Sequence, residues 1–315
     1  MKKKASFAIV GIAVLIVVAL AAAWCLGAFG PSPLGGSRKA LLRYAPKDAN
    51  AIAYVNSKKF YSHKIGKMMM EQPKFMEAIE KFQAKTFGLG AEFDESMVKA
   101  ESDAVVFFKF DFKSGKEPQL WTITRYDKKG IPQKVLDTLK AKKDGDWQIA
   151  AVDGKSAAVL KEKIALIALS DDMLQLSNDP VCLKKGDMPA LAKEIDTDAF
   201  YSFALKIDAE FQAGLKKRTE GRIPCDLNLV TVNARGKGDD LAVEMAGTYE
   251  KAESAKAVAG VIQIGTRAIR GKIPENIAKK LERIKIEAKG KKVVISFTVT
   301  AADVQQAMSD FQEML

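Results

Sequence analysis

The feature that most constrains this chain is the stretch of residues 6–29, which carries no charged side chain. As an α-helix, with a rise of about 1.5 Å per residue, this stretch is long enough to cross a hydrocarbon core of about 30 Å. Lys2, Lys3 and Lys4 precede it and form the positive region that begins an export signal. We therefore expect residues 1–29 to be a signal-anchor with one transmembrane helix, in contact with the lipid bilayer through residues 6–29.

Two other fates of this segment stay open from the sequence. A cleavable signal has an apolar core of about 7–15 residues, which this run exceeds, yet residues 21–23 are all alanine and form an acceptable cleavage site. Cys25 invites comparison with bacterial lipoproteins, but the residue before a lipid-modified cysteine is small and here it is Trp24. An interfacial tryptophan fits a membrane helix, which favours the uncleaved anchor.

The orientation of the chain depends on the charges that flank this segment. Lys2 to Lys4 favour a cytoplasmic N-terminus, whereas Arg38, Lys39 and Arg43 soon after the segment weaken that preference. Because the basic residues abut the apolar run as they do in an export signal, we expect a single-pass protein of the cytoplasmic (inner) membrane. Its soluble part then faces the periplasm or the exterior.

The organisation behind the anchor is predicted from composition and periodicity. Residues 30–37 are rich in proline, glycine and serine and are expected to form a linker. A first α+β half is expected over residues 38–180 and a second over residues 190–315. Residues 178–189 divide them, because two prolines and a glycine interrupt periodic structure there.

The fold class expected for both halves is α+β. Alternating strands joined by tight turns predict mainly antiparallel sheets, with helices covering one face. Strands are expected at residues 51–55, 104–112, 119–126, 147–152, 157–160, 164–169, 173–176, 199–207, 227–234, 241–249, 284–288 and 293–299. Helices are expected at residues 57–85, 131–141, 209–218, 252–269, 273–281 and 301–314.

The two halves have a similar order of strand, helix, hairpin, helix and hairpin. Residues 48–60 resemble 197–211, and residues 147–160 resemble 284–297. A duplicated unit predicts that residues 51–55 superpose on 200–205. It also predicts that the turn at Asp153-Gly154 superposes on the one at Lys289-Gly290, because a turn fixes the register of its hairpin. Chance similarity, one shared sheet and two separate modules all remain open.

This organisation resembles that of uncharacterised exported proteins of Gram-negative bacteria. Their pattern is a short N-terminal anchor, a phrase like the one at residues 42–51 (LRYAPKDANA), and repeated α+β units that end in a charged hairpin with a glycine turn. The resemblance implies an anchored, exported α+β repeat protein. It covers the architecture and names no family, activity or site.

The charge of the chain bears on its partners. The net charge is +11, and only nine of the 50 basic residues are arginines. Lysine is a strongly hydrated point charge, whereas arginine makes the bidentate contacts that read phosphates and bases. No basic stretch is interleaved with stacking aromatic residues, so we expect no nucleic-acid partner. An envelope protein, lipid or polymer is the expected kind of partner.

The sequence offers no candidate catalytic, cofactor-binding or metal-ligating residue. His63 is the only histidine, which excludes multi-histidine metal sites and leaves it as a helix residue without a nucleophile motif nearby. Gly88-Leu-Gly90 completes no nucleotide fingerprint. Ser254 and Lys256 lie two residues apart, on different faces of their helix. The acidic pairs at residues 144–146, 171–172 and 239–240 are interpreted as turns.

Two further features stay open. Cys182 and Cys225 pair only if they are close in space, because the bond requires specific geometry. Residues 68–70 are three methionines on a helix, which indicates core packing or an adaptable apolar surface.

From these observations we expect a non-enzymatic binding or structural protein of the cell envelope, held at the membrane. One alternative is a hydrolase with a site assembled from dispersed carboxylates or from Ser and Lys. Another is a carrier of apolar ligands, with a cavity lined by Met68, Phe75 and Phe82.

Overall fold

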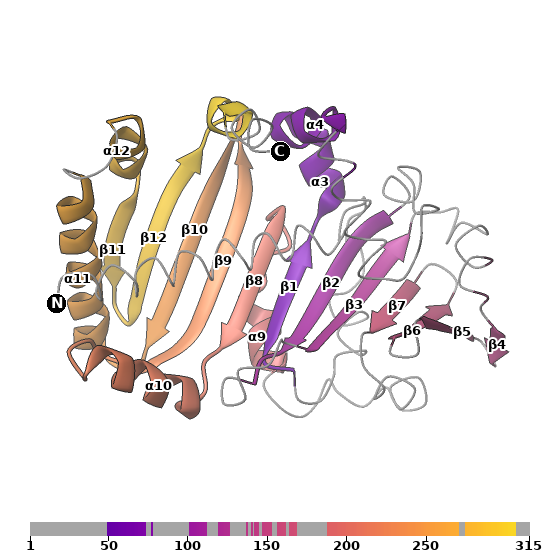
Figure 1. Ribbon diagram of the computed structural model, residues 1–315, viewed down its shortest axis with the longest axis horizontal. Coiled ribbons are helices and arrows are strands. Elements are labelled where there is room, and N and C mark those ends of the chain that lie inside the picture. Colours follow the sequence, from indigo (N-terminus) through magenta and orange to yellow (C-terminus); the bar gives the residue numbers. More distant parts are fainter. Residues whose placement is uncertain are drawn as a thin grey trace.

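A computed structural model gives the fold of this protein (Figure 1). The structure describes residues 49–73, 77, 101–111, 119–126, 137, 140, 142–144, 147–152, 156–161, 164–168, 188–270 and 275–306. The expected anchor over residues 6–29 and the expected linker over residues 30–37 lie outside these residues. None of the helices in the described part of the chain is long and apolar enough to cross a membrane.

In the described part of the chain, twelve strands form one sheet in which every neighbouring pair is antiparallel. The strands are β1 (Ala51–Val55), β2 (Glu101–Lys109), β3 (Gln119–Tyr126), β4 (Lys142–Asp144), β5 (Trp147–Val152), β6 (Ser156–Lys161), β7 (Ile164–Ala168), β8 (Tyr201–Lys206), β9 (Leu227–Lys237), β10 (Asp240–Tyr249), β11 (Lys285–Lys289) and β12 (Lys292–Val299). Their order across the sheet is β11-β12-β10-β9-β8-β1-β2-β3-β7-β6-β5-β4. The expected α+β class with an antiparallel sheet is confirmed.

The helices lie at the ends and on the faces of this sheet (Figure 1). They are α3 (Ser57–Ser62), α4 (Lys64–Met70), α9 (Met188–Glu194), α10 (Ala209–Thr219), α11 (Ala252–Arg270) and α12 (Glu275–Glu282), and residues 301–306 are also helical. The helix expected from residue 57 onward is divided at His63, whose backbone is extended. Met173 to Leu176, expected as a strand, lies outside the described residues.

Strands β1 and β8 join the two halves at the centre of the sheet. They pair in register over five residues, with Ala53 opposite Phe203. Two backbone hydrogen bonds extend this pair symmetrically, from the N–H of Asn56 to the carbonyl of Phe200 (2.7 Å) and from the N–H of Lys206 to the carbonyl of Asn50 (2.9 Å). Outward from this pair, β2 and β3 lie on one side as β9 and β10 lie on the other. Both halves therefore share one extended sheet.

The strand order contradicts one predicted equivalence between the halves. The hairpin of β11 and β12, with its turn at Lys289-Gly290, lies directly beside β10. The hairpin of β5 and β6, the strands on either side of the predicted turn at Asp153-Gly154, is separated from β3 by β7. The prediction that these two turns are equivalent is therefore wrong. The sequence match failed because short alternating strands around a glycine turn look alike wherever they lie in a sheet.

Helices cover both faces of the sheet, so the expectation of helices on one face is wrong. Opposite residues of paired strands share a face, and neighbours along a strand alternate. α11 packs against Ile286 and Ile295. The strand pairs that lead from β12 through β10 and β9 to β8 place these two residues on the same face of the sheet as Phe203. The chain after α9 instead bonds to Ser202, the neighbour of Phe203 on the opposite face.

The core lies under these helices at the central strands. All five residues of β1 are buried, and Phe107 of β2 is fully buried with Tyr54 beside it at 1% exposure. Burial on both faces explains why β1 is a continuous apolar run and does not alternate. Complete burial of one such large apolar side chain contributes about 1.5–3 kcal/mol.

α9 corrects the interpretation of Met188 and Pro189 as the end of the dividing stretch, whose other residues, 178–187, lie outside the described part of the chain. The helix begins at Met188 with Pro189 in its first turn, and Leu191 is 2% exposed. Proline is tolerated in a first helical turn because those N–H groups have no partner within the helix. The proline therefore belongs to the start of a helix that packs on β8 and β1.

Candidate functional site

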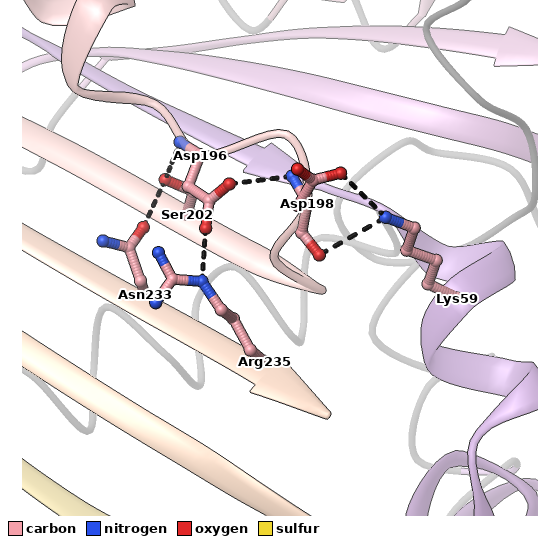
Figure 2. Close-up of polar contacts among 6 residues, drawn as sticks. All are labelled: Lys59, Asp196, Asp198, Ser202, Asn233 and Arg235. Carbon is pink, nitrogen blue, oxygen red and sulfur yellow. Dashed lines mark hydrogen bonds and ion pairs between the residues drawn. The ribbon is translucent and has the colours of Figure 1, made fainter. Parts of the chain in front are cut away.

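A group of polar side chains lies where the chain leaves α9 and enters β8, at the centre of the sheet (Figure 2). We call Asp196, Asp198, Ser202, Asn233 and Arg235 the Asp196 cluster. The hydroxyl of Ser202, which is fully buried, donates to Oδ1 of Asn233 over 2.7 Å. The same hydroxyl accepts from the backbone N–H of Asp196 over 2.9 Å.

Strand register brings the cluster together. Ser202 and Asn233 lie directly opposite each other on β8 and β9, so their side chains share a face. Arg235 is two residues further along β9 and points to the same face. There its Nε donates to Oδ2 of Asp196 over 2.5 Å. The other carboxylate oxygen of Asp196 accepts the N–H of Asp198 over 2.8 Å, an Asx turn that shapes the entry into β8.

The charge of Asp196 is held by its hydrogen bonds. Partial burial, the largest single influence, acts to raise the pKa of this carboxyl group. Against it act the backbone N–H of Asp198, the guanidinium of Arg235 and the backbone N–H of Ala199. Together they outweigh burial and lower the pKa of Asp196 below its ordinary value. Asp196 is therefore an ionised acceptor, unsuited to the role of a general acid.

The cluster extends to α3 through an exposed ion pair. Nζ of Lys59 lies 3.2 Å from Oδ1 of Asp198 and also donates to the backbone carbonyl of Asp198 over 3.4 Å (Figure 2). The Asp198 side chain is 89% exposed, so this pair contributes at most about 1 kcal/mol. Its structural effect is to link a helix of the first half to the turn that opens the second.

The geometry of the cluster indicates a structural role. A catalytic serine needs a base that accepts its proton, and the acceptor of the Ser202 hydroxyl is an amide oxygen. The carboxylate of Asp196 is occupied by the N–H of Asp198 and by Arg235. These bonds fix α9, β8 and β9 relative to one another. Among the described residues, no group of three or more His, Cys, Asp and Glu is arranged to hold a metal ion.

His63 lies at the junction of α3 and α4 and has a clear structural role. Its Nδ1 accepts the backbone N–H of Ile65 over 3.3 Å, which makes it the N-cap of α4. Its Nε2 lies 2.8 Å from the carbonyl of Gly238 in the turn between β9 and β10. A ring whose Nδ1 accepts carries its proton on Nε2, so the second contact is a donated hydrogen bond. His63 thus ties the two short helices to that turn.

The acidic pair at residues 239–240 also serves this junction. Lys64 lies 2.6 Å from Asp239, beside the contact of His63. This exposed bond raises the pKa of Lys64 and lowers that of Asp239. Oδ1 of Asp240 accepts the N–H of Ala301 over 3.2 Å, at the start of the helical residues 301–306. The turn residues therefore bind neighbouring elements.

The remaining residues that the sequence singled out are dispersed. Cys225 is a free thiol, and Cys182 lies outside the described residues. Met69 is buried in α4 while Met68 is half-buried, and Phe75 and Phe82 lie outside the described residues. Ser254 and Lys256 belong to α11, where Lys256 is exposed. The acidic residues 171–172 and the glycines at 88 and 90 also lie outside the described part of the chain.

Sequence reasoning did not single out Ser202, Asn233 or Arg235. The available signal was the polar Ser202 between Tyr201 and Phe203, in a strand that has no other polar residue before Lys206. A polar residue on the buried face of a strand needs a partner. Naming that partner requires the register of β8 against β9, which no local pattern supplies.

Comparison with known proteins gives neither a family nor a function. No family model matches the chain, and no curated protein matches it. Three solved structures, of crystal forms I, III and IV of TP0453, are similar over 85% of this chain, with a TM-score of 0.43 each. Their sequence identity is 8%, 10% and 10%, and 96%, 97% and 96% of those chains is covered. A TM-score of this size carries no conclusion about what this protein does.

Proposed function

We propose that this protein is a membrane-tethered, extracytoplasmic domain that acts as a non-enzymatic binding or structural component of the cell envelope. The observation that carries the proposal is the uncharged run of residues 6–29 behind Lys2, Lys3 and Lys4. Such a run is long enough to span a bilayer, and basic residues before it favour export of the chain behind the span. On this proposal the anchor lies in the cytoplasmic membrane, and the soluble part faces the periplasm or the exterior.

The chemistry of the described polar residues supports a binding or structural role over hydrolysis. The Asp196 cluster and His63 use their hydrogen bonds to join helices to strands. A hydrolase built from dispersed carboxylates needs a pair whose pKa values are pushed apart. The pKa of Asp196 is lowered, and Arg235 is bonded to its carboxylate. These bonds of Asp196 support the proposal of a binding or structural role.

We also infer that the two halves descend from one duplicated unit. The reciprocal bonds at the ends of the β1–β8 pair and the matching order β1-β2-β3 and β8-β9-β10 support this inference. Divergence then lies in the outer strands, where one half has β7, β6, β5 and β4 and the other has β12 and β11. A superposition of residues 51–55 with β2 and β3 onto residues 201–205 with β9 and β10 tests it.

Two measurements test the tether. A phosphatase that is active only outside the cytoplasm, fused after Leu315, should be active, and the full chain should stay in the membrane fraction after an alkaline wash. Leu15→Arg with Val18→Arg should release the chain from the membrane, because a charged side chain at the centre of a membrane helix costs about 2.5–3.5 kcal/mol. Ala13→Ser is the matched control and should remain. An inactive fusion, or retention of the doubly charged variant, contradicts the proposal.

A further inference from the structure

α11 carries two separate apolar faces. It is a 19-residue helix, and its inner face contains Ala255, Val258 and Ala259, which are buried against Tyr249 and Val293. This inner face accounts for the packing of the helix onto the outer strands of the sheet. A helix that rests on a sheet normally presents polar residues on its other side.

The outer side of α11 departs from that expectation. Ala257, Val261, Ile264 and Ala268 lie at spacings of four, three and four residues, so they form one stripe along the helix. Ile264 is 69% exposed and Val261 is 38% exposed, and they are the exposed large apolar side chains of the described residues. At about 100° per residue, the stripe lies roughly 140° around the axis from the buried face. It therefore plays no part in packing α11 onto the sheet.

Glycine in this helix adds to the unusual character of the outer side. Gly260 lies beside the stripe, and a Cβ atom added to it would meet nothing within 4 Å. Internal contacts therefore do not require a glycine here, although glycine in a helix costs about 1 kcal/mol relative to alanine.

The charges beside the stripe decide what kind of surface it fits. Lys256 and Arg267 are exposed along one edge of it, and Arg270 lies in the last turn. Glu253 is the only acidic residue of α11 and lies in the first turn, where the helix dipole favours negative charge. The partner must therefore offer both apolar area and negative charge.

A second copy of the chain does not meet this requirement. In an antiparallel pair of α11 helices, Lys256 of one copy would approach Arg267 of the other. A parallel pair would bring the two copies of Lys256 together, and likewise the two copies of Arg267. Like charges at an apolar contact are costly because they are partly desolvated. The chain as a whole carries +11, which adds to the repulsion. An anionic bilayer surface supplies both acyl chains, which an apolar residue such as Val261 can contact, and phosphates, which a basic residue such as Lys256 can approach.

The position of α11 allows this contact. The helix lies beside β11, the edge strand of the sheet, so its outer side faces away from the other strands (Figure 1). The proposed anchor ends at residue 29 and the described fold begins at residue 49. The residues between them reach at most roughly 65 Å, at about 3.3–3.6 Å per residue. α11 is thus within reach of the membrane that holds residues 6–29.

We propose that the outer stripe of α11 docks on the anionic headgroup surface of the membrane to which the chain is tethered. This inference rests on the proposed tether and names the partner of the domain as lipid. Each interaction alone is weak, and an anchor together with an amphipathic basic surface gives a stable, oriented attachment. The domain then lies with one edge of its sheet against the bilayer.

Depth-dependent quenching tests the docking on the full chain in vesicles. Cys25, Cys182 and Cys225 are replaced by serine, and a fluorophore is attached through Ile264→Cys or, as the matched control, through exposed Lys217→Cys on α10. The vesicles contain phosphatidylcholine alone or with about 30% phosphatidylglycerol, and a brominated lipid serves as quencher. We expect quenching at position 264 to exceed that at 217 by about twofold or more, and to increase with anionic lipid. Equal quenching at the two positions overturns the inference.

A second measurement uses hydrogen exchange across α11 in the same vesicles. The unchanged chain should exchange more slowly over α11 in anionic vesicles than in detergent. Ile264→Glu should abolish this slowing, whereas Ala213→Glu, an equal charge change on the exposed face of α10, should leave it intact. Slowing that survives Ile264→Glu also overturns the inference. An equally slow exchange over α11 in vesicles and in detergent overturns it too. A disulfide crosslink between two copies of the Ile264→Cys variant in detergent would then identify self-association as the cause.

The two proposals fail in different ways. If the full chain leaves the vesicles in an alkaline wash, the tether itself is wrong. If the chain stays in the vesicles while position 264 is quenched no more than 217, the tether stands and the docking of α11 is wrong.

Discussion

Replacing Ser202 by alanine tests the role of the Asp196 cluster directly. The substitution removes one hydroxyl from a fully buried position and keeps the backbone and the Cβ atom. Two hydrogen bonds disappear, the one donated to Asn233 and the one accepted from the N–H of Asp196. The variant therefore separates the contribution of these bonds from changes in apolar packing.

The expected loss is set by these two bonds. A typical intramolecular hydrogen bond contributes about 1 kcal/mol net, so we expect a loss of about 2 kcal/mol in the free energy of unfolding. Full desolvation of both orphaned groups would raise the loss further, but Asn233 is only half-buried, so water can replace part of its bond. For a fold of this size, the shift in Tm is roughly 4–8 °C.

The assay is equilibrium unfolding in urea of the full chain at fixed detergent concentration, monitored by circular dichroism. Ser62→Ala is the matched control, because the Ser62 hydroxyl donates to the carbonyl of Lys59 on an exposed surface. We expect the control to lose no more than about 0.5 kcal/mol. In the double variant with Asn233→Ala, the loss should fall short of the sum of the single losses by about 1 kcal/mol, because both changes remove one shared bond. A loss at Ser202 equal to that of the control, or strict additivity with Asn233, refutes the structural role of the cluster.

Three further predictions concern contacts in the same part of the fold. His63→Ala should lower the free energy of unfolding by about 1 kcal/mol, and His63→Asn, which keeps an N-cap acceptor, should recover part of this loss in a melting experiment. An equal loss in both variants contradicts the capping role. We expect neither variant to change the binding of the domain to its partner. The folded pKa of Asp196 lies below its unfolded value of about 3.9, so its stabilising effect is present above about pH 4 and is lost as pH falls through the folded pKa. Arg235→Gln should therefore reduce the acid-side slope in a plot of unfolding free energy against pH. An unchanged slope argues against the Asp196–Arg235 pair. Gly236→Ala should destabilise by about 1–3 kcal/mol, because its Cβ would lie 2.6 Å from Cζ of Phe200, whereas Gly214→Ala on α10, with nothing within 4 Å, should stabilise by about 1 kcal/mol in the same melting experiment.

Much of the fold was predictable because its signals are local. The expected strand at residues 51–55 and the observed β1 coincide, and so do the expected strand at 119–126 and β3. The expected helix at 252–269 differs from α11 by one residue. In each case hydrophobic periodicity and a bounding turn lie within the same short window.

What the sequence could not supply depends on contacts between distant residues. The pairing of β1 with β8 joins residues 51–55 to 201–205, and no local pattern reports it. The same holds for the Asp196 cluster, whose members lie on β8, on β9 and in the segment between α9 and β8. α9 itself was missed because Pro189 and Gly186 resemble loop residues, although proline is allowed in a first helical turn.

The β1–β8 pair also explains why the boundary between the halves is not a boundary between independent units. Every residue of β1 is buried, and the strand is hydrogen-bonded along one edge to β2 and along the other to β8. Removal of the second half would leave β1 as a continuous apolar edge strand with unpaired N–H and C=O groups, which favours aggregation. The Lys59–Asp198 pair and the contacts of His63 and Lys64 with the β9–β10 turn cross the same boundary. The first half is therefore part of one shared sheet, and its central strand and its helix junction are completed by the second half.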